Sequence, residues 1–312
     1  MQRKDFDKIA ERLRNWGRWG NEDQRGTLNH IGPEALQRAA TSVQSGKMFA
    51  LGLNFDKNGP QPQGMRMNPQ LYMTAIAQVM NPNFPEVVFS DDVVHMSLQC
   101  ATQWDALSHA HYDGVLYNGC KACDVLSTAG ASRNGIEHLA NPGIMARGVL
   151  LDIPRLKGID RLEGGTLVTV DDLRAACDKQ GVSIQAGDIV MVRTGHIDHF
   201  TIDKSMMNFY MNNPGVTTEV AEWLYDHSAA AIAADNLAVE TTPMESFGGP
   251  EMPLPFHMLC LREMGLPLGE MWNLSPLAED CAKDGQYTFL LAAPPLAITG
   301  AVGSPVNPVV LK

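Results

Sequence analysis

Short apolar segments bounded by turn-forming residues constrain the fold of this chain more than any other feature. They predict strands over residues 73–79, 92–98, 148–153, 188–193, 229–234 and 287–292. Helical periodicity is confined to fewer segments, at residues 5–16, 33–43, 171–179, 217–226 and 256–264. Because strands outnumber helices after the N-terminal part, the pattern predicts an α/β fold with a β-rich core.

The domain organisation is predicted to be simple. The 312 residues contain no internal repeat, low-complexity tract or linker, so we expect a single domain. Residues 1–46, which hold the first two predicted helices, would form an N-terminal helical extension, and residues 47–312 the main domain. Several Pro, Gly and Asn residues between positions 60 and 70 predict an exposed loop.

The charge balance excludes some classes of partner. The chain has 24 Lys and Arg residues against 35 Asp and Glu residues, a net charge of −11. Nucleic acids and anionic membranes attract basic surfaces, so neither is expected as the main partner, and a small-molecule substrate is favoured. No apolar run approaches the ~20 residues of a membrane span. The first residues lack the apolar core of a secretory signal, so a cytoplasmic location is predicted.

Polar side chains cluster directly after the predicted strand 92–98. Gln99, Gln103, Asp105 and His109 occupy odd-numbered positions, and in an extended chain these side chains point to the same side. Two amides, a carboxylate and an imidazole on one face are costly to bury unless they bind a ligand or one another. Trp104 alternates away from that face and is expected in the core.

Two residues far downstream complete a candidate metal site. His257 stands near the start of the predicted helix 256–264, and Glu270 follows its end. Together with Asp105 and His109 they supply two imidazoles and two carboxylates, a set that suits Zn²⁺ or Mn²⁺. Such an ion lowers the pKa of a bound water, so that hydroxide is available near neutral pH.

Four further residues are candidates for catalysis or substrate binding. His111 would join the cluster as a general acid if the extended geometry continues past His109, and it would otherwise be a loop histidine. His196 follows the predicted strand 188–193 and could donate to an oxyanion, although a surface role fits it equally well. Trp19 and Tyr112 are candidates for the aromatic wall of a substrate pocket.

The segment from Gln99 to His109 resembles the signature H-x-G-T-H-x-D-x-P-x-H of the cyclase family of metal-dependent hydrolases, which includes bacterial kynurenine formamidase and isatin hydrolase. The resemblance runs from about Gly17 to about Pro305 and is closest to a longer bacterial branch. The other segments that carry it are Gly26-Thr27-Leu28-Asn29, Tyr112-Asp113-Gly114, Arg193-Thr194-Gly195-His196, Asn213-Pro214-Gly215, Ala234-Asp235-Asn236, His257 and Glu270.

The resemblance implies a swivelling β/β/α-type catalytic domain that forms a homodimer or homotetramer. It implies a hydrolase that cleaves a C–N or C–O bond of a small cyclic or aromatic amide, lactam or lactone through a metal-activated water. Asp105, His257 and Glu270 would hold the ion. His109 would be either a further ligand or the general base, and Gln99 and Gln103 would orient the substrate or complete the coordination.

The chain departs from the family signature at two positions. Gln99 and Gln103 stand where the signature has its first two histidines. Glutamine coordinates only through a neutral carbonyl oxygen, so we expect one divalent ion, Mn²⁺ or Zn²⁺, or none. Without an ion, the acidic and histidine side chains would hydrogen-bond one another. Two alternatives therefore stay open: a metal-free lyase or isomerase with His109 as general base, and a non-catalytic small-molecule-binding protein.

Overall fold

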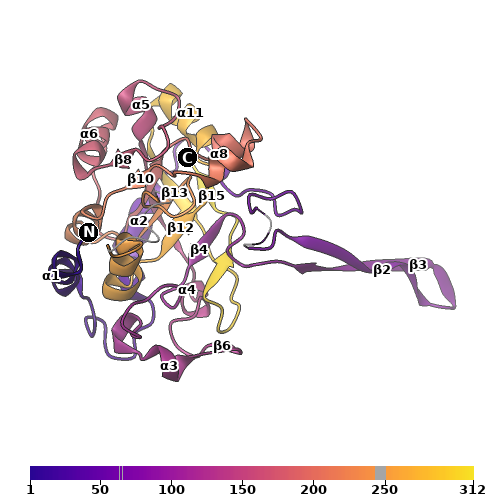
Figure 1. The fold of residues 1–312 in the computed structure, drawn as a ribbon. Helices are drawn as coiled ribbons and strands as arrows, with labels where there is room; N and C mark the ends of the chain where they lie inside the picture. Colours follow the sequence, from indigo (N-terminus) through magenta and orange to yellow (C-terminus); the bar gives the residue numbers. More distant parts are fainter. Residues whose placement is uncertain (63, 65, 243–250) are drawn as a thin grey trace.

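The computed structural model describes residues 1–62, 64, 66–242 and 251–312. They form a mixed α/β domain around one curled nine-stranded sheet (Figure 1). The sheet order is β1-β15-β13-β7-β9-β11-β12-β4-β14. In chain order, these strands are β1 (Met48–Ala50), β4 (Gln103–Asp105), β7 (Met145–Asp152), β9 (Ile189–Arg193), β11 (Ala231–Ala234), β12 (Leu268–Glu270), β13 (Thr288–Ala292), β14 (Gly303–Pro305) and β15 (Val309–Leu311).

The centre of the sheet is parallel and its flanks are antiparallel. Strands β7, β9, β11 and β12 run parallel, whereas β13 pairs antiparallel with β7, and β4 pairs antiparallel with β12. Every residue of β9 and β11 is buried. Parallel strands covered on both faces read as continuous apolar runs, which is why the sequence located them. The strands predicted at 148–153, 188–193, 229–234 and 287–292 are thus confirmed as β7, β9, β11 and β13.

Helices and short elements cover this sheet. The longer helices are α1 (Arg3–Leu13), α2 (Pro33–Thr41), α6 (Val170–Gln180), α9 (Val220–Asp226) and α11 (Ser275–Asp284). The shorter helical segments are η1 (Gly26–His30), η2 (Tyr117–Gly119), α3 (Ala122–Val125), α4 (Glu137–Ala140), α5 (Ile153–Lys157), α7 (Asp198–Thr201), α8 (Met206–Tyr210), α10 (Pro255–His257) and η4 (Met258–Met264). Two minor pairs of strands are β5 (Leu126–Ser127) with β6 (Gly130–Ala131), and β8 (Leu167–Val168) with β10 (Gly215–Val216).

The predicted helices are confirmed with shifted ends. Helix α1 buries Phe6, Ala10 and Leu13 and packs against η4 and α9. It ends at Leu13, because Arg14 is extended, and Trp16 therefore lies beyond it. Helix α6 begins with a capping box between Thr169 and Asp172 and ends at a left-handed glycine, which are the local signals that predict it. Within the described residues, no helix combines the length and apolar character needed to cross a membrane.

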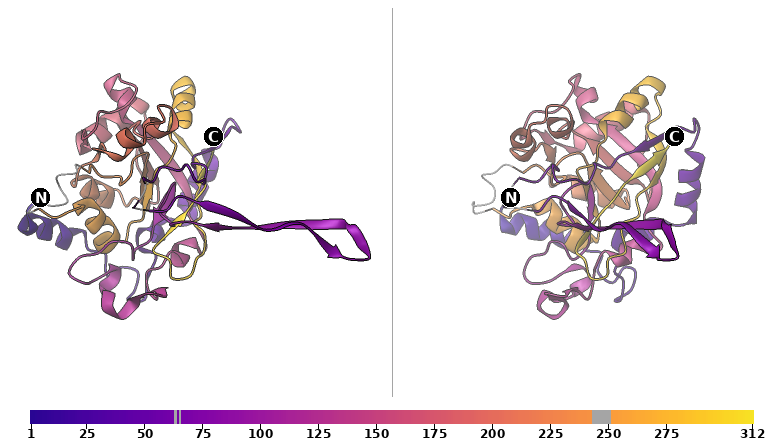
Figure 2. Two further views of the ribbon diagram at one scale, coloured as in Figure 1. Left: turned by 45° about the vertical axis from the view of Figure 1, so that its right-hand side comes forward. Right: turned by 90° about the vertical axis from the view of Figure 1, so that its right-hand side faces the viewer.

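The strand predicted at 73–79 exists, and the one predicted at 92–98 is strand only over 92–95, but neither is a core strand. They belong to β2 (Gln70–Asn81) and β3 (Phe84–His95), which pair with each other and form a separate two-stranded hairpin. This hairpin, residues 70–95, is called the arm below, and it projects far from the body of the molecule (Figures 1 and 2). Its side chains are mostly exposed. Apolar composition predicted these strands, but it could not show that the rest of the chain leaves them exposed.

The loop predicted at 60–70 is only partly exposed. Its residues 63 and 65 lie outside the described part of the chain. Gln61 is buried, and its side chain donates to the backbone carbonyl of Cys100 at 3.0 Å. Arg66 donates to the carbonyl of Gln99, also at 3.0 Å. The loop is therefore folded over the start of the polar segment rather than displayed to solvent.

Candidate metal centre

Two neighbouring strands bring the acidic residues of the candidate site together. Strands β4 and β12 pair so that Glu270 lies opposite Gln103, and Asp105 stands at the end of β4. Gly269 allows β12 to lie close to both neighbouring strands, because a Cβ there would lie 3.0 Å from Cζ3 of Trp104 on β4 and 2.7 Å from the Cβ of Ala233 on β11. Trp104 points into the core, as its alternation predicts, and its ring packs 5.0 Å from that of Trp272.

The extended segment is shorter than the sequence pattern suggests. Only Gln103–Asp105 is strand, so the alternation does not run from position 99 to position 109. Gln99 lies in the turn before β4. His109 lies in the turn after it, where its N–H donates to the carbonyl of Ala106 at 2.9 Å. The turn nevertheless brings His109 Nε2 to 3.7 Å from Asp105 Oδ1.

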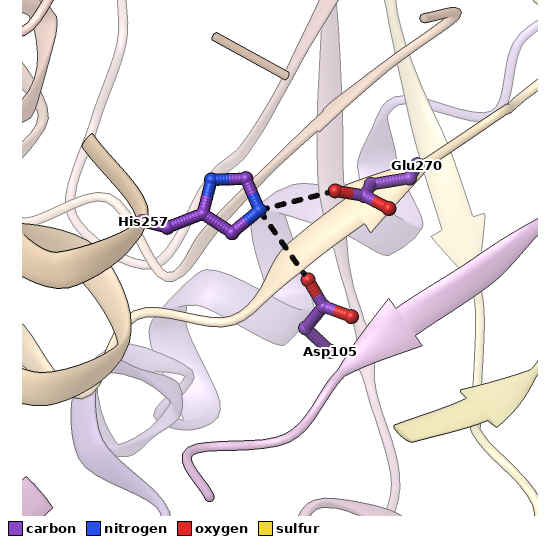
Figure 3. A group of neighbouring side chains, drawn as sticks. All are labelled: Asp105, His257 and Glu270. Carbon is purple, nitrogen blue, oxygen red and sulfur yellow. Dashed lines mark hydrogen bonds and ion pairs between the residues drawn. The ribbon is translucent and has the colours of Figure 1, made fainter. Parts of the chain in front are cut away.

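His257 reaches the same place from the helical side of the molecule. It is the last residue of α10, and the π-helical segment η4 follows it directly. Glu240 fixes its ring, because one carboxylate oxygen lies 2.6 Å from His257 Nδ1 and accepts the backbone N–H of His257 at 2.9 Å. The other ring nitrogen, Nε2, therefore faces Glu270 Oε1 at 3.2 Å and Asp105 Oδ2 at 3.7 Å (Figure 3).

Asp105, His257 and Glu270 form a compact group of possible ligands. Each offers one ligand atom, and these atoms all lie within 4.8 Å of one another. All three side chains are buried, with Asp105 0% exposed. His109 is not a member of this group, although it lies beside Asp105. Asp105, His257 and Glu270 thus converge as expected, whereas His109 lies beside this group and not within it.

The residues present fit a divalent cation. Asp105 Oδ2 is buried without a hydrogen-bond partner, and so is Gln103 Oε1. Burial, followed by the neighbouring charge of Glu270, raises the pKa of Asp105 well above its ordinary range. A cation among the three ligand atoms would satisfy the orphaned oxygen and relieve the repulsion between the carboxylates. One imidazole and two carboxylates suit Zn²⁺ or Mn²⁺.

Gln103 faces this group as a hydrogen-bond donor. Its amide Nε2 lies 2.5 Å from Glu270 Oε2 and 3.3 Å from Asp105 Oδ1. Both carboxylates are thereby held in place by the residue that stands at a histidine position of the family signature. The sequence predicts that this amide binds the substrate or the ion. In this structure its N–H groups instead donate hydrogen bonds to the candidate ligands Asp105 and Glu270.

The two histidines of the site have opposite electrostatic surroundings. Burial disfavours a proton on His257, but hydrogen bonds to Glu240 and Glu270 outweigh it and raise the pKa of His257 to about 10. Burial lowers the pKa of His109 to about 4; the negative charge of Glu270 opposes this shift, and the positive charges of His257 and Arg66 add to it. His109 is therefore neutral near pH 7 and able to accept a proton.

The other predicted site residues lie in varied surroundings. Tyr112 donates from its hydroxyl to Glu263, packs edge-on against Phe6 and lies under the guanidinium of Arg262. These contacts tie it to the interface between α1 and η4. Trp19 packs edge-on against His30. His111 is half-buried, two residues beyond His109. The structure does not bring Tyr112 or Trp19 into the ligand group, and the roles suggested for all three stay predictions.

His196 and Gln99 also lie outside the ligand group. His196 is almost fully buried, its Nε2 lies 2.7 Å from the carbonyl oxygen of Phe209, and its ring stacks on the Phe209 ring. His196 Nε2, the atom proposed to donate to an oxyanion, is thus already in contact with a backbone carbonyl. Gln99 is half-buried and packs beside Gly303 of β14, where a Cβ would lie 2.6 Å from its Nε2.

Sequence reasoning missed two residues of this site, Glu240 and Arg66. Glu240 lies in an irregular segment after β11, and no periodic or motif signal marks it. Arg66 lies in the Pro- and Gly-rich loop, half-buried, and its positive charge acts to lower the pKa values of Asp105 and His109. Both come from segments whose spatial neighbours depend on the whole fold.

Comparison with known proteins places these observations in a family. Residues 30–241 match the family described as "Putative cyclase". A crystal structure described as a novel cyclase is 38% identical, with a TM-score of 0.86, and the match covers 97% of this chain and 99% of that one. The comparison with curated proteins gave no match.

Two more distant structures share the fold. Isatin hydrolase A from Ralstonia solanacearum is 17% identical, with a TM-score of 0.62 and coverage of 90% of this chain and 98% of that one. A predicted metal-dependent hydrolase from Bacillus stearothermophilus is 15% identical, with a TM-score of 0.50 and coverage of 85% and 97%. The family match spans more than half of the residues, and the 38% identical structure aligns over nearly the whole chain. The chain belongs to the cyclase family.

Proposed function

We propose that the protein is a hydrolase that cleaves a C–N or C–O bond of a small cyclic or aromatic amide, lactam or lactone, using one divalent ion, Mn²⁺ or Zn²⁺. The observation that carries the proposal is the buried group of Asp105, His257 and Glu270, with Glu240 behind His257. The fold shared with isatin hydrolases supports the reaction class. The swivelling β/β/α description of the domain belongs to the same proposal.

The ligand set has the supporting structure that metal sites require. When bound, the ion would lower the pKa of a coordinated water and polarise a substrate carbonyl. Asp105, His257 and Glu270 would hold it. Glu240 keeps the His257 ring in one orientation through Nδ1, an arrangement that makes the other nitrogen a better ligand. Gln103 keeps the carboxylates of Asp105 and Glu270 from rotating.

The position and surroundings of His109 support its assignment as the general base. Its Nε2 lies 3.7 Å from Asp105, outside the ligand group, and its ring is neutral near pH 7 because burial lowers its pKa to about 4. A neutral imidazole beside a ligand carboxylate can take a proton from the attacking water at Nε2. His109 is also the most exposed of these histidine and acidic side chains, at 22%, so it faces the side from which a substrate would enter.

Arg66 would stabilise negative charge during the reaction. Hydrolysis of an amide or lactone develops an oxyanion and ends in a carboxylate, and a nearby guanidinium favours both. Arg66 lies close enough for its charge to act on the pKa values of Asp105 and His109. We therefore expect Arg66→Gln to raise KM and lower kcat/KM while leaving the metal content unchanged. Lys57→Gln is the matched control, and equal kinetics in both variants would exclude this role.

Metal analysis combined with a substrate screen tests the proposal. Protein purified without chelators should contain one equivalent of Mn²⁺ or Zn²⁺ by elemental analysis, and it should hydrolyse members of a panel of cyclic amides and lactones. Asp105→Asn should lose both the ion and the activity, whereas the exposed-loop control Asp203→Asn should keep both. Tight binding of panel compounds without turnover would instead identify a non-catalytic binding protein.

A metal-free lyase or isomerase is the second candidate, and one observation favours it. Gln103 donates to both carboxylates, and His257 bonds Glu270, so much of the polar group is satisfied internally. In that case His109 would act as general base alone. Activity that survives exhaustive chelation would support this candidate over the hydrolase. The unsatisfied Asp105 Oδ2 is the reason for preferring the metal-dependent reaction.

A further inference from the structure

Buried polar atoms without hydrogen-bond partners gather at two places in this molecule. Within the described residues there are 11 such side-chain atoms, and those of Gln103, Asp105 and His109 belong to the candidate metal centre. Four others come from two segments outside that centre, and they are Arg25 Nε, Arg133 Nε, Asn134 Oδ1 and Glu137 Oε2. Buried polar groups are nearly always satisfied, so this second group needs an explanation that the proposed hydrolysis does not supply.

A cavity of about 580 Å³ lies where these segments meet. It is lined by parts of the chain that are far apart in sequence, between positions 22 and 25, 137 and 141, and 297 and 299. The lining residues that matter here are Asp23, Gln24, Arg25, Glu137, His138 and Asn141. The ligand group of the metal centre lines no part of this cavity.

Arg25 brings an unpaired positive charge to the cavity. The side chain is half-buried, and its guanidinium forms no hydrogen bond or ion pair with the described residues. Burial lowers the pKa of Arg25, and the negative charge of Asp23 opposes this shift only in part. A half-buried cation without a partner costs stability, because burial removes water that would otherwise solvate the charge.

Glu137 brings a carboxylate to the same cavity. Its Oε2 is buried without a partner, and its Oε1 lies 3.7 Å from Nε2 of His138. Gly135 makes room for this carboxylate, because a Cβ at that position would overlap Oε2. Arg25 and Glu137 thus line one cavity with opposite charges, yet they form no ion pair with each other.

The walls around the two charges are held in place by other residues. Asp23 accepts the hydroxyl of Tyr117 at 2.9 Å and the backbone N–H of Gly26 at 2.9 Å. The Gln24 side chain accepts the backbone N–H of Asn134 at 2.8 Å. The hydrogen-bonding capacity of Asp23 and Gln24 is therefore largely used within the fold, whereas that of Arg25 and Glu137 is left for a ligand.

We propose that this cavity binds a free α-amino acid, with Arg25 holding its carboxylate and Glu137 its ammonium group. A guanidinium forms two parallel hydrogen bonds to a carboxylate, and a carboxylate oxygen accepts readily from an ammonium group. A ligand with only one of these charges would leave the opposite wall unpaired, so a zwitterion fits better than a simple anion. His138 and Asn141 in the lining favour an amino acid with a small or polar side chain.

Calorimetric titration of the full chain with each standard amino acid tests the class of ligand. At least one should bind at one site per chain with a Kd below about 1 mM. The carboxylic acid and the amine that each lack one charge of that amino acid should bind at least about 10-fold more weakly. If no amino acid binds, the proposal is wrong. If the carboxylic acid binds as tightly as the amino acid, the cavity is a simple anion site and the zwitterion assignment fails.

Substitutions locate the binding. Arg25→Gln and Glu137→Gln should each weaken it about 10- to 100-fold, the usual effect of losing a hydrogen bond to a charged group. Arg174→Gln is the matched control, because the Arg174 side chain is 65% exposed, and it should bind like the unmodified chain. Asp105→Asn should also leave the binding unchanged. Binding that is lost in Asp105→Asn and kept in both cavity variants would place the amino acid on the metal centre and exclude the proposed site, whatever the outcome for hydrolysis.

Thermal melting separates a binding role of Arg25 from a structural one. Without an amino acid, Arg25→Met removes an unpaired charge and should melt at the same temperature as the unmodified chain or higher. Arg147→Met is the contrasting variant, because Arg147 pairs with the buried Asp188 at 2.6 Å, and it should melt lower. The amino acid that binds should raise the melting temperature of the unmodified chain and not that of Arg25→Met. An equal fall in both variants would show that Arg25 stabilises the fold instead of holding a ligand.

Discussion

Glu240 is the residue that orients the imidazole of His257, one of the three candidate ligands. It touches His257 through both the ring Nδ1 and the backbone N–H, and it also accepts the N–H of Phe256. Glu240→Gln keeps an acceptor oxygen but removes the charge. We expect metal affinity to fall 10- to 100-fold, the usual effect of losing an outer-shell partner, while the fold persists. Competition with a chromophoric chelator measures this, with the exposed Glu279→Gln as control. Unchanged affinity would show that Glu240 does not tune the site.

The role of His109 is resolved by separating turnover from metal content. As a general base it contributes about 10²- to 10⁴-fold to the rate, so His109→Ala should lose that factor per folded molecule. Because His109 lies outside the ligand group, the variant should keep its ion. Loss of the ion together with the activity would instead make His109 a ligand. Near-native turnover in the folded variant would contradict the mechanism.

The sequence predicts the residues of the site better than their geometry. Asp105 was identifiable from the polar cluster that follows a predicted strand, whereas His257 and Glu270 are not diagnostic alone and were assigned as ligands through the resemblance to the cyclase family. Their approach, however, depends on β12 lying beside β4, a pairing of three-residue strands that no local pattern marks. Glu240 reaches His257 for the same reason, through tertiary packing that a single sequence does not display.

At the scale of elements, the sequence pattern predicted a strand or helix correctly where the whole element has the same surroundings along its length. Strands β9 and β11 are buried throughout, and α6 carries its own capping box, so composition and local signals agree with the fold. The arm shows the limit of this reasoning. Its apolar strands satisfy the same pattern as core strands, and only the three-dimensional structure shows that the rest of the chain does not cover them.

The packing of β12 against its neighbours gives a prediction at this scale. A Cβ on Gly269 would lie 2.7 Å from the Cβ of Ala233 and 2.9 Å from Trp272 Nε1. Gly269→Ala should therefore push β12 away from the core, at a cost of about 1–3 kcal/mol in the free energy of unfolding. It should also lower metal affinity, because the adjacent Glu270 moves with the strand. Gly32→Ala, with nothing within 4 Å, is the control. Equal urea midpoints for both variants would contradict the packing argument.

At the scale of the whole molecule, buried histidines couple stability to pH. Burial is the main cause that lowers the pKa values of His30, His109 and His196 to about 4 each, from an ordinary value of 6.5. A histidine with a lowered pKa stabilises the fold while it is neutral. This contribution is complete above about pH 6.5 and is lost as the pH falls toward 4, where the unfolded chain takes up protons that the folded chain does not.

His196 provides the clearest test of this coupling, because it lies outside the ligand group and its ring packs on Phe209. In His196→Phe the stacking is kept and the titrating group is removed. Between pH 6.5 and 4 the free energy of unfolding should therefore decline less steeply, by up to about 1.4 kcal/mol per pH unit for one proton. Urea denaturation at several pH values measures the slope, and a slope equal to that of the unmodified chain would refute the assignment. The same variant examines the predicted oxyanion role of His196. If His196 only packs on Phe209, the variant should retain its turnover per folded molecule at pH 7.5. A loss of kcat with unchanged metal content would instead support a role for His196 in the active site.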